Sequence, residues 1–188
     1  METSFFASML LHPVALGCLA LVVLGATLVA AEKAMGAVRF TITQLLRGFF
    51  CVAIAALVVA AVAAYVPAEE AQRLGVKPEN YQSVLLHQFV VLSTICTYAA
   101  LLGCAFVGLP ITLRLATRNQ ATTPLVVLAS LPISLLASLA LGLLSGIQMK
   151  HIGQAGLQFA AAHALLALGF SLGLGLPWRR VKTRANEA

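Results

Sequence analysis

The stretch that decides the fold is residues 125–178, LVVLASLPISLLASLALGLLSGIQMKHIGQAGLQFAAAHALLALGFSLGLGLPW. Two uncharged runs, residues 125–147 and 157–178, flank one short polar segment, residues 148–154. A single helix over the whole stretch would be more than twice as long as the roughly 20 apolar residues that cross a bilayer. The stretch therefore predicts two membrane spans joined by a tight helical hairpin.

Three more uncharged runs of spanning length lie upstream, at residues 11–31, 48–66 and 84–109, and the third can extend to Leu113. Backbone groups in lipid must be satisfied within a helix or a closed barrel. Barrel strands would alternate polar and apolar residues, which these runs do not. We therefore expect an all-α, polytopic membrane bundle of five transmembrane helices that forms a single domain over residues 1–188.

The composition excludes a water-soluble domain and several types of catalytic and metal site. The chain is 61% hydrophobic and 10% charged, with a mean hydropathy of +0.97, whereas soluble domains are about 45–50% apolar and about 25% charged. All six acidic residues are glutamates. The absence of aspartate from the sequence excludes Asp-based metal cages, Ser-His-Asp triads and aspartyl dyads.

Basic residues are divided unevenly between the two sides of the predicted bundle. Nine of the twelve Lys and Arg lie in residues 32–47, 114–118 and 179–188, which share one side. The other side holds only Arg73, Lys77 and Lys150. An excess of Lys and Arg marks the cytoplasm. The pattern predicts a cell inner-membrane protein with the N-terminus outside and a basic cytoplasmic tail at 179–188, and it does not favour nucleic acid as a partner.

The N-terminus lacks the positive charge of a secretory signal, because Glu2 is its only charged residue,. We therefore expect the first span to be retained. The outer connection, residues 67–83, is predicted to carry a short interfacial helix, since Pro67 and the acids Glu69 and Glu70 precede Arg73 and Gly75,. This connection is either a spacer or the main external recognition surface, with Glu69 and Glu70 as contacts.

Small residues recur every four positions in three of the predicted spans. Helices in lipid associate where small residues let their backbones approach. We expect these stripes to pack helices within one chain or between copies in a homo-oligomer. The candidate packing residues are Ser130, Ser134, Ser138, Gly142 and Gly146 in span four and Gly169 and Gly173 in span five; span three has a parallel series, Cys96, Ala100, Cys104 and Gly108.

The four histidines, His12, His87, His151 and His163, all fall in the predicted outer half of the bundle. His163 lies ~12 Å below the outer surface at 1.5 Å per residue. Ionisable groups at that depth are costly and usually face an interior partner. The histidines are either an outward-facing polar pocket or interfacial residues wetted by headgroups. His163 and His87 are only weak candidates for metal or haem ligands because their depths differ, and we predict no cofactor.

No motif points to catalysis. The four cysteines form no Cys-x-x-Cys pair, and no carboxylate lies inside a span to couple transport to ions,. We predict a non-catalytic bacterial inner-membrane protein that binds a partner protein in or at the membrane. It would be a complex subunit or an immunity protein against a membrane-targeting toxin. The alternative is an outward-facing small-molecule, metal or haem carrier subunit that uses the outer-half histidines.

Overall fold

The computed structural model describes residues 8, 11–33, 40–65, 68–73, 75–144 and 149–179. Within these ranges, only the backbone is described for residues 31–33, 68, 70, 134, 137–144 and 149–155. The described residues contain helices and no strand. The helices are α2 (Pro13–Lys33), α3 (Ile42–Ala64), α4 (Ala68–Arg73), the 3₁₀ turn η1 (Pro78–Asn80), α5 (Tyr81–Gly103), the π turn η2 (Cys104–Gly108), α6 (Leu109–Thr117), α7 (Thr123–Leu144) and α8 (Met149–Leu174).

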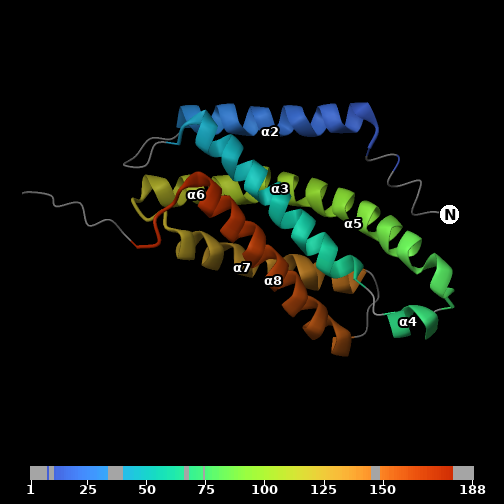
Figure 1. Cartoon of the computed structure of the whole chain (residues 1–188). Coiled ribbons are helices and arrows are strands. Elements are labelled where there is room, and N and C mark those ends of the chain that lie inside the picture. Colours follow the sequence, from blue (N-terminus) through green and yellow to red (C-terminus); the bar gives the residue numbers. More distant parts are fainter. Residues whose placement is uncertain are drawn as a thin grey trace, which may run out of the picture.

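The long helices run in alternating directions (Figure 1). The rod formed by α5, η2 and α6 runs parallel in sense to α2 and α8, and α3 and α7 run the opposite way. Four stretches are long and apolar enough to cross a membrane: Pro13–Ala30, Ile42–Ala64, Pro78–Thr117 and Gly156–Leu174. These confirm the expected all-helical, multi-pass membrane character. In α7, the shorter apolar helix Thr123–Ile133 falls within the described side chains.

Several helices begin earlier than the apolar runs that predicted them. α3 starts at Ile42 rather than near residue 48, because Thr41 forms a capping box with Gln44,. The Thr41 hydroxyl accepts the Gln44 backbone N–H at 3.2 Å, and the Gln44 side-chain oxygen accepts the Thr41 N–H at 2.9 Å. α8 starts at Met149, so residues 149–154 form its first turns. The one other residue of the expected hairpin, Gln148, lies outside the described residues, as do residues 145–147 at the end of the preceding span.

The third predicted span is part of one 40-residue helical rod, Pro78–Thr117. A π turn interrupts it, where the Leu109 N–H donates to the Cys104 carbonyl five residues back. Pro110 explains this turn, because it has no N–H to offer the Phe106 carbonyl in an α-helical pattern. The rod ends at Thr117, and Asn119 in the following turn adopts a left-handed φ of 55°.

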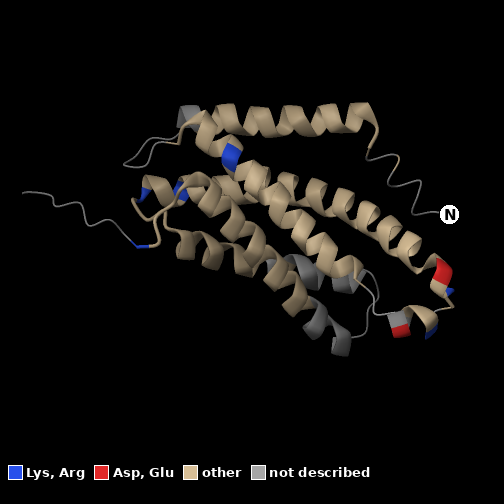
Figure 2. Cartoon of the chain, viewed as in Figure 1, with Lys and Arg blue, Asp and Glu red and all other residues tan. Residues whose placement is uncertain are grey.

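Four of the described arginines lie at one end of the bundle, and the glutamates whose side chains are described lie at the other, together with two basic residues (Figure 2). The first end, here named the arginine end, carries Arg47, Arg114, Arg118 and Arg179. The opposite end, named the glutamate end, carries Glu69, Arg73, Lys77 and Glu79. α4 lies at the glutamate end, where the sequence predicts a short helix. It terminates at Gly75, whose φ of 83° suits glycine,.

The hydrophobic core lies toward the arginine end, where α3 crosses α8 at van der Waals distance. A methyl group added at Gly173 would lie 2.6 Å from the Gly48 Cα and 2.8 Å from the Arg47 carbonyl oxygen. One at Gly169 would lie 3.2 Å from the Cys51 carbonyl oxygen. Beside this crossing, the Phe49 and Phe170 rings meet edge-on with centroids 5.8 Å apart. Only glycine at 173 allows the two backbones to approach this closely.

Hydrogen bonds from three helices close the arginine end. The Arg47 Nε donates to the Gly173 carbonyl at 2.7 Å, which satisfies an acceptor in the last turn of α8,. Gly175, with a φ of 72°, ends α8, and its N–H donates to the Leu172 carbonyl. The buried Thr123 then joins α7 to the turn after α8: its N–H donates to Pro177 at 3.0 Å and its hydroxyl to Leu176 at 3.1 Å.

Candidate functional site

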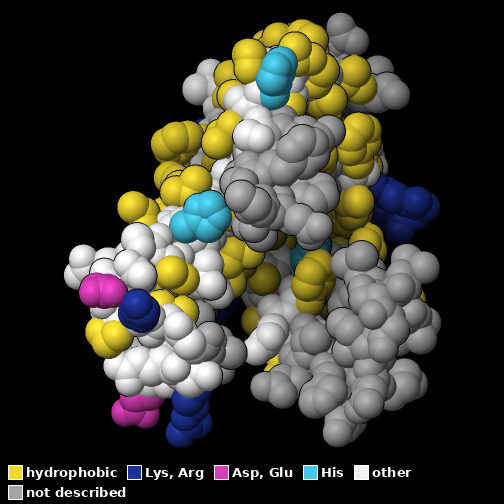
Figure 3. Space-filling model, turned by 90° about the vertical axis from the view of Figure 1, so that its right-hand side faces the viewer, with side chains coloured by type: hydrophobic (Ala, Val, Ile, Leu, Met, Phe, Trp, Pro, Cys, Tyr) yellow, Lys and Arg dark blue, Asp and Glu magenta, His cyan; other side chains and the backbone are white. Residues whose placement is uncertain are grey.

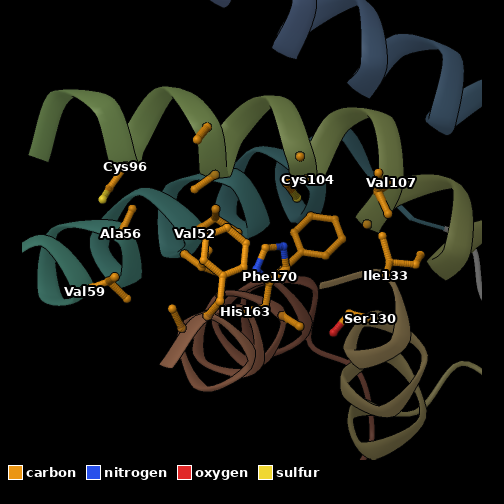
Figure 4. A pocket seen from close by; sticks show the side chains of 18 of the residues that line it. Val52, Ala56, Val59, Cys96, Cys104, Val107, Ser130, Ile133, His163 and Phe170 are labelled. Atoms are coloured by element: carbon orange, nitrogen blue, oxygen red, sulfur yellow. The ribbon is translucent and has the colours of Figure 1, made fainter. Parts of the chain in front are cut away.

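A cavity of about 470 Å³ lies between four elements: α3, the α5–η2–α6 rod, α7 and α8 (Figure 4). Val52 and Ala56 come from α3, Ile133 from α7, and Phe170 closes the side toward the core. The volume falls within the range of about 300–1,000 Å³ that is typical of small-molecule sites. The cavity therefore has the size of a ligand site.

His163 projects from α8 into the wall of this cavity (Figure 4). Its ring is half-buried and tilted against the Phe159 ring, with centroids 5.3 Å apart. The Phe159 backbone carbonyl, one turn earlier, lies beside the ring. One carbonyl can engage only one of the two ring nitrogens, so the other can hydrogen-bond to a molecule in the cavity.

The rest of the described lining is almost entirely apolar. Gln158 is exposed, and the Ser130 hydroxyl donates at 2.8 Å to Val127 of its own helix. Cys96 and Cys104 contribute free thiols. Among the described residues that line the cavity there is no Asp, Glu, Lys or Arg. The arrangement suits reversible binding of an uncharged, lipid-soluble molecule, because an unpaired charge would be costly to bury there.

A second pocket, of about 650 Å³, lies beside the first turns of α5. Ser83, His87 and Gln88 supply its polar side chains, and Val91 and Ala63 are among its apolar ones. Ala63 also lines the main cavity, so the two spaces are neighbours. The structure thus brings His87 and His163 to adjoining pockets rather than to one shared ligand position.

The other candidate binding residues lie away from the cavity. His12 precedes α2, is exposed, and its Nδ1 accepts the Val14 N–H at 3.4 Å. Glu69 is exposed on α4, and Glu70 follows it in the same helix, with its side chain outside the described set. His151 lies in the first turn of α8, and its side chain is likewise not described. The described part of the chain holds no group of three His, Cys, Asp or Glu positioned for a metal ion.

The small-residue stripes lie in two different environments. Gly169 and Gly173 contact α3 directly, as described above. Ser130 and the span-three series Cys96, Ala100, Cys104 and Gly108 line the cavity instead. Ser134, Ser138 and Gly142 belong to α7 with undescribed side chains, and Gly146 lies outside the described residues.

Sequence reasoning missed Arg47, Gly48 and the π turn. Gly48 is followed by the small residues Cys51 and Ala55, a pattern that could have identified the face of α3 that receives α8. Pro110, late in a long apolar run, is a signal for a local break in helical hydrogen bonding,. Nothing in the sequence indicates that Arg47 bonds to a residue 126 positions away.

Histidine side chains come to the surface on the face that includes the glutamate end (Figure 3). This face is hollowed, and hydrophobic side chains lie beside the hollow (Figure 3). The described histidines are thus on the side away from the four arginines. Comparison of the chain with protein-family models, with curated proteins and with solved structures finds no match.

Proposed function

We propose that this protein is a non-catalytic membrane protein that binds a lipid-soluble small molecule in the cavity around His163. The observation that carries the proposal is an apolar cavity of about 470 Å³, walled by four helical elements, with the His163 imidazole among its described lining residues. Apolar walls with few polar groups are typical of small-molecule sites. The proposal develops the small-molecule alternative of the sequence analysis and needs neither metal nor haem.

We place this cavity in a five-span bundle of the bacterial inner membrane, with the N-terminus outside. Two observations support the topology: the alternating direction of the five long helices and the grouping of Arg47, Arg114, Arg118 and Arg179 at one end,. A cytoplasm-active reporter fused after Ala188 should be active, and the same reporter inserted at Lys77 should be silent. Activity at both positions would contradict the proposed topology.

The binding proposal is tested by filling the cavity. Gly103 lines it, and a Cβ added there meets nothing within 4 Å. Gly103→Leu should therefore fold and occupy part of the ligand space. Gly25→Leu is the matched control, because Gly25 also has nothing within 4 Å but lies on α2, away from the cavity.

The measurement is native mass spectrometry of each protein purified from its membrane in mild detergent. We expect an adduct of fixed mass on the wild type and on Gly25→Leu, and its loss from Gly103→Leu. Absence of an adduct from the wild type, or equal adducts on all three proteins, would overturn the proposal.

His163 is tested separately by exchanging it for Leu and for Gln. If one of its ring nitrogens bonds the ligand, His163→Leu should keep the fold and lose most of the adduct, while His163→Gln retains part. Loss of folding in both variants would instead identify a buried structural hydrogen bond. Thermal unfolding of the purified variants separates the two results.

A second function, binding of a partner membrane protein, has one observation of its own. The N-terminal half of α2 makes little contact with the rest of the chain: between residues 13 and 25, only Leu19 is buried. Thr27 and Ala30, by contrast, are fully buried. An exposed face with open space at Gly17 and Gly25 could receive a helix of another subunit, of a toxin or of a second copy,.

Affinity purification distinguishes this second function from the first. Gly17→Leu should release a bound membrane partner and leave the cavity adduct unchanged, whereas Gly103→Leu should do the reverse. Co-expression of two differently tagged copies tests whether the partner is the chain itself. Identical association of wild type and Gly17→Leu would remove α2 as the docking surface.

A further inference from the structure

The two pockets follow one another along the α5–η2–α6 rod. Positions spaced by four residues line first the pocket at the start of α5 and then the main cavity. Four residues turn an α-helix by about 400°, so each step advances about 40° around the rod, and the lining winds around it from one pocket to the next. The series is Val84, Gln88 and Leu92 in the second pocket and Cys96, Ala100, Cys104 and Gly108 in the main cavity.

Ala63 of α3 lines both spaces and so lies where they adjoin. A small side chain at this position leaves room beside it. The pockets can therefore be occupied by one elongated molecule that passes Ala63.

The dimensions of the cavity fit one hydrocarbon chain rather than two. At about 30 Å³ for each water-sized group, the volume of the main cavity corresponds to roughly fifteen such groups,. One acyl chain therefore fills the main cavity, and the second pocket is left for the head of the same molecule.

The polar groups of the combined groove are concentrated at one end. His87 and Gln88 offer imidazole and amide groups that both donate and accept hydrogen bonds,. Ser83 adds an acceptor oxygen, because its hydroxyl proton is donated to the Asn80 carbonyl at 2.8 Å. None of the described residues that line either pocket is a Lys, Arg, Asp or Glu. A headgroup rich in hydroxyls matches these groups, whereas a charged headgroup would have no counter-charge.

We infer that the two pockets form one groove for a single-chain, uncharged amphiphile. Its hydroxyl-bearing head lies beside His87 and Gln88, and its chain passes Ala63 into the cavity around His163. The inference rests on the proposed function, which requires only that the cavity binds something lipid-soluble. It adds the chemical class, the orientation and the second set of contacts.

The experiment measures binding of four probes to the full chain in nanodiscs of defined phosphatidylcholine, by native mass spectrometry. The probes are monopalmitoylglycerol, palmitate, dipalmitoylglycerol and hexadecane. They offer an uncharged head on one chain, an anionic head on one chain, an uncharged head on two chains, and a chain without a head. We expect monopalmitoylglycerol to bind about tenfold more tightly than any of the others.

Two sets of variants locate the head and the chain. His87→Leu combined with Gln88→Leu should weaken monopalmitoylglycerol about tenfold and leave hexadecane unchanged. The matched control combines His12→Leu with Gln82→Leu, at exposed positions that line neither pocket, and should change nothing. Gly103→Leu should weaken both probes.

The outcomes separate this inference from the proposed function. If hexadecane binds as well as monopalmitoylglycerol and only Gly103→Leu weakens it, the cavity binds ligand but the head site is wrong. Tightest binding of palmitate or dipalmitoylglycerol would overturn the uncharged or the single-chain assignment, respectively. If no probe binds the wild type while a native adduct is still lost on Gly103→Leu, the amphiphile inference fails and the proposed function stands.

Discussion

The helices α3 and α8 behave differently at their two ends. At the arginine end they touch through Gly48 and Gly173 and are joined by a hydrogen bond from Arg47. Toward the glutamate end the same two helices, through Val59 and His163, form walls of a cavity. One helix pair therefore supplies both a close contact at the arginine end, here named the joint, and walls of an open cavity. The joint holds the walls in place, so the site does not need to be closed by its own contacts.

The largest loss of stability should come from a substitution at the closest contact between α3 and α8. Gly173→Leu places a side chain where even a Cβ lies 2.6 Å from the Gly48 Cα, and neither backbone can move away alone. Overpacking of this kind costs about 3 kcal/mol or more. We expect a marked fall in the detergent unfolding temperature and loss of monodisperse protein. Gly25→Leu is the control, and equal stability of the two variants would mean that α3 and α8 do not touch here.

A smaller loss should follow from removing the side chain that bridges the joint. Arg47→Met deletes the 2.7 Å bond to the Gly173 carbonyl while keeping the aliphatic stem,. A hydrogen bond from a charged donor is worth about 1.5–3 kcal/mol, and we expect the lower figure because Arg47 is exposed,. Chemical unfolding measures this loss. Arg118→Met, which removes a charge from the same end, should have less effect.

The contact between the start of α7 and the turn after α8 should contribute less to stability than the Arg47 hydrogen bond. Thr123→Val keeps the shape of a fully buried side chain and removes its 3.1 Å bond to the Leu176 carbonyl. We expect a loss of about 1 kcal/mol. Thr117→Val is the comparison, because that hydroxyl is exposed and bonds within its own helix. A similar loss in both variants would show that the contact between helices adds nothing.

The smallest predicted change in stability is a slight increase, caused by a substitution in the wall of the cavity. Gly103→Ala has open space for its Cβ, and alanine is favoured over glycine inside a helix by up to about 1 kcal/mol,. We expect slightly raised stability. Gly48→Ala should instead be destabilising, since its Cβ would lie 3.0 Å from the Phe170 ring. Stabilisation by both substitutions would contradict the contrast between tight packing at Gly48 and open space at Gly103.

Local signals in the sequence account for much of the fold. Apolar length locates the long helices, and Glu69, Arg73 and Gly75 indicate the short α4. Helix starts are less predictable, because hydropathy reports which residues prefer lipid, whereas Thr41 and Gln44 begin α3 through hydrogen bonds. The side of the membrane that each end faces remains a prediction from charge.

Of the candidate site, the sequence could predict only His163. His163 is conspicuous because imidazole is rare and costly within a span. The cavity around it is not, since its walls are common apolar residues from four separate segments. Small residues at a spacing of four do not distinguish contact from open space. On α8 they meet α3, and on α5, as at Ala100 and Cys104, they border the cavity.

The π turn at Cys104–Gly108 limits how this chain can change in length. A π turn holds one more residue than the α-helical turn it replaces, and each residue of an α-helix turns the chain by about 100°. Deleting one residue here would restore regular winding and rotate all of α6. Leu109, Thr112 and Ala116 would then leave the core, where each is buried. We expect point substitutions in this turn to be tolerated more readily than a single-residue deletion, which would misdirect the rest of the chain toward α7.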